Sequence, residues 1–154
     1  MARIPCPRHF IRLFVLRYMQ QLTINTSKTP KGYSASCDLM PGWVVAYEGD
    51  FDGFKDYVRE SIRFYVDCAL ADGEPFSEIL ASPDLTLSYK FDIQSLLAHY
   101  QNIFSFAALQ YITGVNQRQL WHYAAGRSKP RPRQAEKIVG ALNRLGKELV
   151  SLSV

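Results

Sequence analysis

The spacing of hydrophobic residues predicts a small sheet in the first half of the chain. Apolar and polar residues alternate over residues 22–26 and 33–37, which is the period of a half-buried strand. Residues 43–47 are rich in the aromatic and β-branched side chains that suit strands. Short Lys-Gly and Met-Pro-Gly sequences separate these segments, and such residues form tight turns. Because the connections are so short, we expect the three strands to form an antiparallel meander.

A long amphipathic helix is predicted after the third strand. Asp50 or Asp52 is the expected N-cap, and Gly73 ends the helix. Residues 75–80 suggest a short helical turn, and residues 85–91 form another alternating strand. The apolar residues that recur at three and four positions, as on a buried helix face, are Phe54, Val58, Ile62, Tyr65 and Ala69. The order βββαβ predicts an α+β domain in which the helix covers one face of the sheet.

The remainder of the chain has the periodicity of helices. A helix is expected from Asp92 to Tyr100, and Ser105 can cap another one that ends at Gly114. Asn116 can then cap a further helix, which runs to about Ala125. Two helices around a turn with glycine are the plan of a helix-turn-helix unit. The fold class predicted for the whole chain is therefore α+β followed by an all-α helix-turn-helix domain.

An apolar stripe closes the sequence. Its members recur at three and four positions and are Ala135, Ile138, Leu142, Leu145, Leu149 and Leu152. The stripe either completes the core of the helix-turn-helix domain or forms a dimer seam. Core packing is our prediction, because so small a domain needs the apolar surface. Gly146 leaves open whether residues 134–152 form one helix or two.

The helix-turn-helix segment carries side chains that suit DNA. In such units the N-terminal residues of the second helix contact base edges in the major groove. A Gln side chain can form two hydrogen bonds with one adenine, and an Arg side chain can form two with one guanine. We expect base contacts from a group on the exposed face of that helix, namely Asn116, Gln117, Arg118 and His122. Partial burial of His122 beside Tyr123 is an equally good interpretation. An ordinary helical hairpin with a solvated polar face is the structural alternative to the whole assignment.

A basic arm follows the second helix. Arg127, Lys129, Arg131 and Arg133 alternate with Ser128, Pro130 and Pro132. Prolines keep a backbone extended, so alternate charges can follow a phosphate strand. We expect phosphate contacts from these four cations and from Ser105.

The balance of acidic and basic residues changes at the same place in the chain as the hydrophobic pattern. Residues 19–92 contain 6 Lys or Arg and 12 Asp or Glu, whereas residues 93–154 contain 8 Lys or Arg and 2 Glu. DNA repels the first part and attracts the second, so we expect modules with different partners at residues 20–92 and 93–154. Residues 1–18 hold four Arg and no acid. We expect residues 1–19 to be a poorly ordered extension, with a natural start at Met19.

The sequence gives little support for a metal-binding, membrane or enzymatic function. The three Cys residues lie about thirty positions apart without a CxxC pair, and the three His residues have no metal-ligand spacing. No apolar run reaches the roughly 18 residues of a membrane span. We therefore predict no enzymatic activity, no catalytic or metal-binding residues, no cofactor and no membrane partner. A reducing cytoplasm is the expected location.

Two family resemblances give these patterns a specific meaning. The run TGVNQRQLWHYAAGRSKPRP resembles the repressor-type helix-turn-helix of phage and bacterial regulators. By that resemblance Gln117, Arg118 and His122 match base-reading positions. Gln110 stands where this family usually has a small residue, so it either separates the helices or needs a local polar partner. Phe106 stands where a polar phosphate contact is frequent.

The segment GYSASCDLMPGWVVAYEGDFDGFKDYVRESIRFYVDCALADGEPF resembles the HicB antitoxin domain. The resemblance implies a type II antitoxin that masks a small basic HicA-type toxin, an RNA-cleaving enzyme, and represses its own operon. A homodimer or higher oligomer on a near-palindromic operator DNA is expected. The alternative is a stand-alone helix-turn-helix transcription regulator whose N-terminal domain dimerises or senses a ligand. HicB domains are described as similar to ribonuclease H, but residues 22–26 contain no acid for a nuclease metal site.

Overall fold

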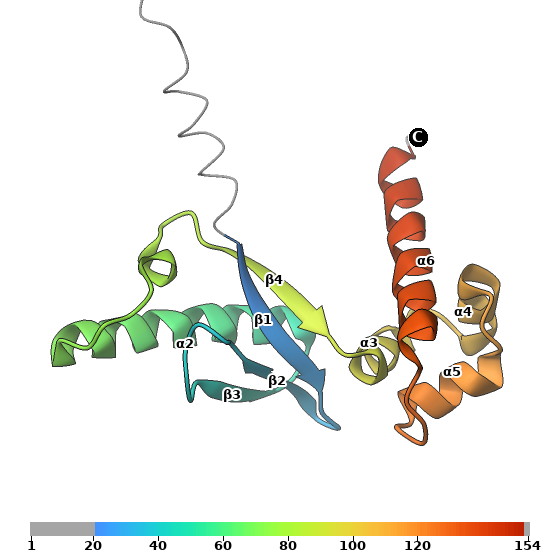
Figure 1. Ribbon diagram of the computed structural model, residues 1–154, viewed down its shortest axis with the longest axis horizontal. Helices are drawn as coiled ribbons and strands as arrows, with labels where there is room; N and C mark the ends of the chain where they lie inside the picture. Colours follow the sequence, from blue (N-terminus) through green and yellow to red (C-terminus); the bar gives the residue numbers. More distant parts are fainter. Residues whose placement is uncertain (1–20, 153–154) are drawn as a thin grey trace, which may run out of the picture. The chain divides into compact units, whose positions relative to one another are not determined.

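The computed structural model describes residues 21–152 (Figure 1). The predicted extension at residues 1–19 lies outside the described residues. Contacts between Cα atoms divide the chain into two compact units. Among the described residues, the N-terminal unit comprises residues 21–26 and Lys31–Lys90, and the C-terminal unit comprises Ser27–Pro30 and residues 91–152.

The N-terminal unit is a four-stranded mixed sheet with one long helix. The strands lie in the order β3-β2-β1-β4, and α2 runs along the sheet (Figure 1). Its elements are β1 (Gln21–Lys28), β2 (Gly32–Ser36), β3 (Val44–Glu48), α2 (Phe51–Asp72), a short 3-10 helix η1 (Glu78–Ala81) and β4 (Thr86–Phe91). The α+β class is confirmed for this unit, and the strands and helix follow one another in the predicted order.

The core of the N-terminal unit follows from the alternation in its strands. On β1 the side chains of Leu22, Ile24 and Thr26 are buried, and their neighbours are more exposed. The Thr26 hydroxyl satisfies its hydrogen bonding in this core by donating to the Ile24 carbonyl at 3.2 Å. Strands β2 and β3 are antiparallel, with Gly32 opposite Glu48, as the predicted meander requires.

Helix α2 has the predicted caps and a buried face that differs from the prediction at one position. Asp50 is the N-cap, and its carboxylate accepts a hydrogen bond from the Gly53 N–H at 2.8 Å. Gly73 ends the helix in the left-handed conformation. The buried residues are Phe54, Val58, Ile62, Val66 and Ala69. Tyr65 is only half-buried, so its prediction as a core residue is wrong. A long aromatic side chain at the border of the buried face can leave the core while Val66 enters it.

The C-terminal unit is built from four helices, α3 (Ile93–Tyr100), α4 (Phe106–Thr113), α5 (Gln117–Ala124) and α6 (Pro132–Ser151). Its core consists of Leu97, Leu109, Val115, Leu120, Tyr123 and Ile138. Phe106 packs against this core, which explains an aromatic residue at the start of α4. Asp92 caps α3 by accepting a hydrogen bond from the Ser95 N–H at 2.8 Å.

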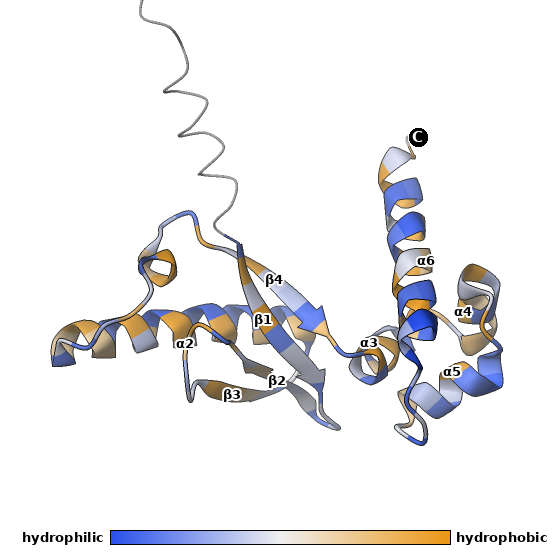
Figure 2. Ribbon diagram, in the orientation of Figure 1, coloured by the Kyte–Doolittle hydropathy of each residue, from blue (hydrophilic) through white to orange (hydrophobic). Residues whose placement is uncertain are grey.

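Helix α6 is one continuous helix, so Gly146 does not divide it. Hydrophobic residues recur along its length (Figure 2), but their burial decreases toward the C-terminal end of the helix. Ile138 and Ala141 are buried, whereas Leu149 and Leu152 are 55% and 68% exposed. The prediction that the whole stripe packs into the core is therefore wrong for its last two members, whereas Leu142 still packs against the core.

No helix between residues 21 and 152 combines the length and the apolar character that a membrane crossing requires.

Candidate nucleic-acid interface

Helices α4 and α5 begin and end at the residues that the sequence predicted. The Ser105 hydroxyl accepts a hydrogen bond from the Ala108 N–H at 3.1 Å and so caps α4. Gly114 ends that helix with a φ of 64°, a conformation that glycine adopts without a Cβ penalty. The Asn116 side chain caps α5 by accepting from the Arg118 N–H at 2.9 Å. The turn between the helices is therefore defined at both ends by local side chains.

Hydrogen bonds from side chains hold the turn itself in place. The Thr113 hydroxyl donates to the Leu109 carbonyl at 2.7 Å and accepts from the Val115 N–H at 3.2 Å. From α6, the Lys137 ammonium donates to the Gly114 carbonyl at 2.9 Å. Val115 is buried between the helices. The positions of α4 and α5 are consequently coupled through this turn.

Gln110 has the local polar partner that was one of its two expected outcomes. Its side-chain oxygen accepts a hydrogen bond from the Gln117 N–H at 2.8 Å. That N–H lies in the first turn of α5, where backbone donors have no partner within the helix. A large polar residue at this position of α4 thus serves as an additional cap for α5.

The exposed face of α5 contains the predicted base-reading residues. Asn116, Gln117 and Arg118 are exposed at the N-terminal end of the helix. His122 is half-buried, and its ring centroid lies 5.1 Å from that of Trp121. The opposite face, with Leu120 and Tyr123, is buried. This arrangement leaves the first turn of α5 open to a ligand and holds the helix by its other face.

Trp121 belongs to this surface and was not predicted from the sequence. It is 40% exposed, and the Arg127 guanidinium lies over its ring at 4.4 Å from the centroid. This cation–π contact holds Arg127 beside α5. The helical spacing could have identified Trp121, because it lies one turn after Gln117 on the same exposed face.

Lys129 and Arg131 meet at a polar pocket of about 300 Å³. Its other lining residues are Gln119, Tyr123, Ser128 and Gln134. Within it the Gln119 amide donates to the Tyr123 hydroxyl at 2.7 Å. Two cations beside a hydroxyl and an amide are the kinds of group that bind phosphate oxygens. Gln119 is a second residue of this surface that sequence reasoning missed.

The predicted arm is shorter than expected, and Arg133 is not part of it. Helix α6 begins at Pro132, a position at which proline is favoured because the first helical N–H needs no partner. Arg133 therefore lies in the first turn of α6. An extended arm that presents four evenly spaced cations is thus wrong. Arg127 stacks on Trp121, whereas Lys129 and Arg131 line the polar pocket.

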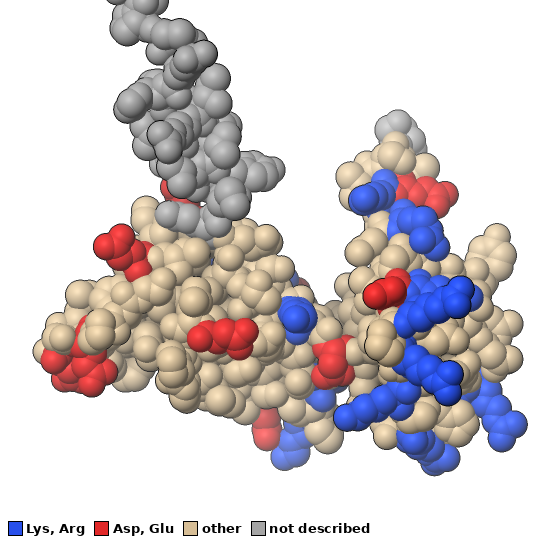
Figure 3. All heavy atoms as spheres, in the orientation of Figure 1, with Lys and Arg blue, Asp and Glu red and all other residues tan. Residues whose placement is uncertain are grey.

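The C-terminal unit is strongly basic on the visible side (Figure 3). Lys and Arg side chains gather there, while exposed acids predominate on the N-terminal unit. Burial, together with the nearby charge of Lys28, lowers the pKa of His99 from its usual range. Its ring stacks on Phe91 at a centroid distance of 5.3 Å.

Comparisons with models of protein families, with curated proteins and with solved structures find no match to this chain. Among the described residues, 21–152, no group of three or more His, Cys, Asp or Glu side chains is arranged to hold a metal ion.

Proposed function

We propose that this protein is a DNA-binding antitoxin of the HicB type, which represses its own operon and masks a small basic RNA-cleaving toxin in the cytoplasm. The observation that carries the DNA-binding part is the arrangement of α4 and α5. The first turn of α5 is exposed and carries Gln117 and Arg118, while the polar pocket with Lys129 and Arg131 lies next to the same helix. This combination suits base contacts flanked by phosphate contacts.

The division of labour between base and phosphate contacts can be tested with two single substitutions. Arg118→Ala is expected to relax base preference at one position of the operator, at a cost of about 1–3 kcal/mol. Lys129→Ala should weaken binding to all sequences alike and reduce the salt dependence of affinity, because it removes a phosphate contact. Binding of each variant to DNA selected from a random library, measured at several salt concentrations, distinguishes the two effects.

Arg144→Ala is the matched control for charge removal. Arg144 is exposed on the second half of α6, is not part of α5 and does not line the polar pocket. Its affinity and base preference should stay close to those of the wild type. Equal and uniform losses from Arg118→Ala and Lys129→Ala would contradict the proposed position of α5 in the major groove.

The surface of α2 supports the second part of the proposal. Tyr57, Glu60, Phe64 and Asp67 follow one another at three and four positions, so they share one face of the helix. We call this set the outer stripe of α2. All four residues are exposed, Phe64 to 69%. Exposed aromatic side chains between acids suit a basic protein partner, since aromatic anchors dominate binding energy and charge complementarity guides the encounter.

The partner proposal is tested by co-expression with the small open reading frame beside the gene. Rescue of growth and a stable complex in a pulldown are the expected results. Phe64→Ala should weaken the complex by about 2 kcal/mol or more, roughly 30-fold, because it removes a central aromatic anchor. Leu70→Ala is the control, since Leu70 is similarly exposed on α2 but lies outside the outer stripe.

If the neighbouring product is neither toxic nor bound, the antitoxin part fails and DNA binding stands alone. A complex that tolerates Phe64→Ala as well as Leu70→Ala would keep the antitoxin part but place its interface elsewhere on the N-terminal unit.

A further inference from the structure

The N-terminal unit contains a pocket that the proposed function does not use. Its volume is about 310 Å³, which is near the lower limit for small-molecule sites. Helix α2 forms one wall, and η1 together with the segment that leads into β4 forms the other. We call it the arginine pocket, after Arg59 and Arg63 in its lining. The size of the pocket suits a small molecule.

The inner part of the arginine pocket is apolar. Ile62 and Val66 of α2 and Leu80 of η1 are buried, and all three line the pocket. Leu85 and Leu87 add half-buried apolar surface from the opposite wall. In small-molecule sites an apolar lining surrounds the body of the ligand, and a few polar groups fix its orientation. This lining therefore favours a ligand with an apolar body.

Two arginines supply positive charge to the pocket. Arg59 and Arg63 lie one turn apart on α2, and both are exposed. Acids stand three or four positions from them, at Asp56, Glu60 and Asp67, where helical ion pairs can form. Within residues 21–152, however, neither guanidinium is paired with a carboxylate. Both side chains are therefore available to an anion in the pocket.

A buried hydroxyl lies on the same side of the sheet as this pocket. Tyr89 follows Leu87 on one face of β4, and its hydroxyl has no hydrogen-bond partner among the described residues. Burial raises the pKa of Tyr89, and the positive charge of Arg59 opposes that rise. The guanidinium is therefore within electrostatic range of the hydroxyl. A cation and a hydroxyl donor in the same region both favour an acceptor oxygen.

The charges in the lining favour a ligand with a single negative charge. Guanidinium groups bind carboxylate and phosphate oxygens through paired hydrogen bonds. Because Cβ atoms four positions apart on a helix are about 5–6 Å apart, Arg59 and Arg63 can hold the same group. Asp67 lines the pocket as well, so two cations and one acid give the lining a net charge of +1. A monocarboxylate fits this charge better than a phosphate ester.

We propose that the arginine pocket binds a small organic monocarboxylate with an apolar body. The carboxylate lies between Arg59 and Arg63, and the apolar body covers Ile62, Val66 and Leu80. Residues 19–92 hold 12 acids and 6 Lys or Arg, so two of the few cations in this acidic segment gather at one pocket. The site goes beyond the proposed function, because neither operator DNA nor a toxin takes part in it.

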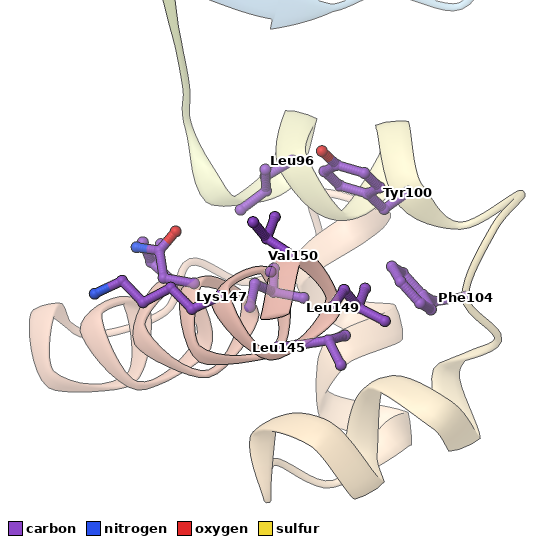
Figure 4. Close-up of a pocket in the computed structure, with 11 residues that line it drawn as sticks. Leu96, Tyr100, Phe104, Leu145, Lys147, Leu149 and Val150 are labelled. Atoms are coloured by element: carbon purple, nitrogen blue, oxygen red, sulfur yellow. The ribbon is translucent and has the colours of Figure 1, made fainter. Parts of the chain in front are cut away.

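A larger cavity in the C-terminal unit has a different lining (Figure 4). It is a groove of about 790 Å³ between Leu96 and Tyr100 of α3 and Leu149 and Val150 of α6. Among the described residues, Lys147 is the only charged one in its lining. An uncharged apolar molecule can bind to either cavity, whereas a carboxylate gains paired hydrogen bonds from the two arginines. The groove therefore serves as an internal reference for binding that is driven by apolar contact alone.

The probe for this site is hexanoate, added to the full chain with its Ile, Leu and Val methyl groups labelled for NMR. Hexanoate should shift the methyl signals of Ile62, Val66 and Leu87 with a Kd of about 1 mM, as expected for so small a ligand. Hexanamide has nearly the same shape without the charge and should bind at least about tenfold more weakly. Hexyl phosphate should bind no more tightly than hexanoate, because Asp67 opposes its second charge.

Substitution of either arginine tests the charge directly. Arg59→Gln and Arg63→Gln should each weaken hexanoate binding at least about tenfold and leave the weak binding of hexanamide unchanged. Both positions are exposed, so the variants should fold as the wild type does. Lys90→Gln is the matched control, because Lys90 is exposed on β4 and does not line the arginine pocket. Its affinity for hexanoate should equal that of the wild type.

The proposal is overturned if hexanoate shifts no signal in the arginine pocket, or if it shifts only Leu96 and Val150 in the groove of the C-terminal unit. Equal affinities for hexanoate and hexanamide, or equal losses from Arg59→Gln and Lys90→Gln, would also contradict it. Much tighter binding of hexyl phosphate would overturn the choice of a monocarboxylate. The titration contains neither DNA nor a toxin, so failure of this proposal and failure of the proposed function are separate results.

Discussion

Replacement of Gly32 by alanine is expected to destabilise the N-terminal unit by more than about 3 kcal/mol. Gly32 lies at the start of β2, opposite Glu48 of β3. A Cβ at this position would collide with the Tyr47 carbonyl oxygen and lie 2.9 Å from the Glu48 Cα. Both are backbone atoms of the paired strand, so no side-chain rotation can relieve the clash. The variant must separate β2 from β3 or shift their register.

Denaturant titration followed by circular dichroism measures this cost. Gly73→Ala is the matched control in the same unit, because an added Cβ there meets no atom within 4 Å and only the φ of 68° is unfavourable. The control should lose about 1 kcal/mol. If Gly32→Ala cost no more than Gly73→Ala, the close approach of β2 and β3 at Gly32 would be incorrect.

Leu120→Ala is expected to lower the free energy of unfolding by about 3 kcal/mol. We expect the variant to lose DNA binding as a result. Leu120 is fully buried at the centre of the core that α3, α4, α5 and α6 share. A unit of this size has little stability to spare. The substitution removes apolar contacts and leaves a cavity beneath the helix that carries Gln117 and Arg118. The base-reading face would then lose its support even though none of its residues has changed.

The next residue in the chain provides the comparison. Trp121→Ala removes a larger side chain, but Trp121 is 40% exposed and contacts Arg127. We expect a loss of only about 1 kcal/mol in stability from that cation–π contact. Thermal melting and DNA binding should therefore separate the two neighbours. Equal losses of stability would contradict the assignment of opposite faces on α5.

Local chemistry explains why the helix boundaries around the turn could be predicted. Ser105, Gly114 and Asn116 act on backbone groups within a few residues of themselves, so their effects do not depend on the rest of the fold. Alternation in the strands and the apolar face of α2 are equally local in origin. Local patterns could not show that Val66 is buried in place of the predicted Tyr65. Which of the two residues enters the core depends on how much room the sheet leaves at the border of that helix face.

The basic arm shows the same division. The composition of the arm identified its cations. It did not predict that Arg127 stacks on Trp121 or that Lys129 and Arg131 line one pocket. Those contacts join residues of different elements, and their geometry exists only after α5 and α6 have packed. Arg133 entered α6 because Pro132 is well suited to the first position of a helix, a local signal that the pattern of alternating prolines obscured.

The sequence by itself determined the elements of this protein, their order, the caps around the helix-turn-helix and the separation of acidic from basic residues. All of these depend on short-range periodicity, local hydrogen bonding and composition. Only the tertiary structure decided which part of the α6 stripe is covered. The core of the C-terminal unit is filled after Ile138, Ala141 and their neighbours have packed. The remaining apolar residues of that helix face outward, because a continuous helix carries them past the end of the core.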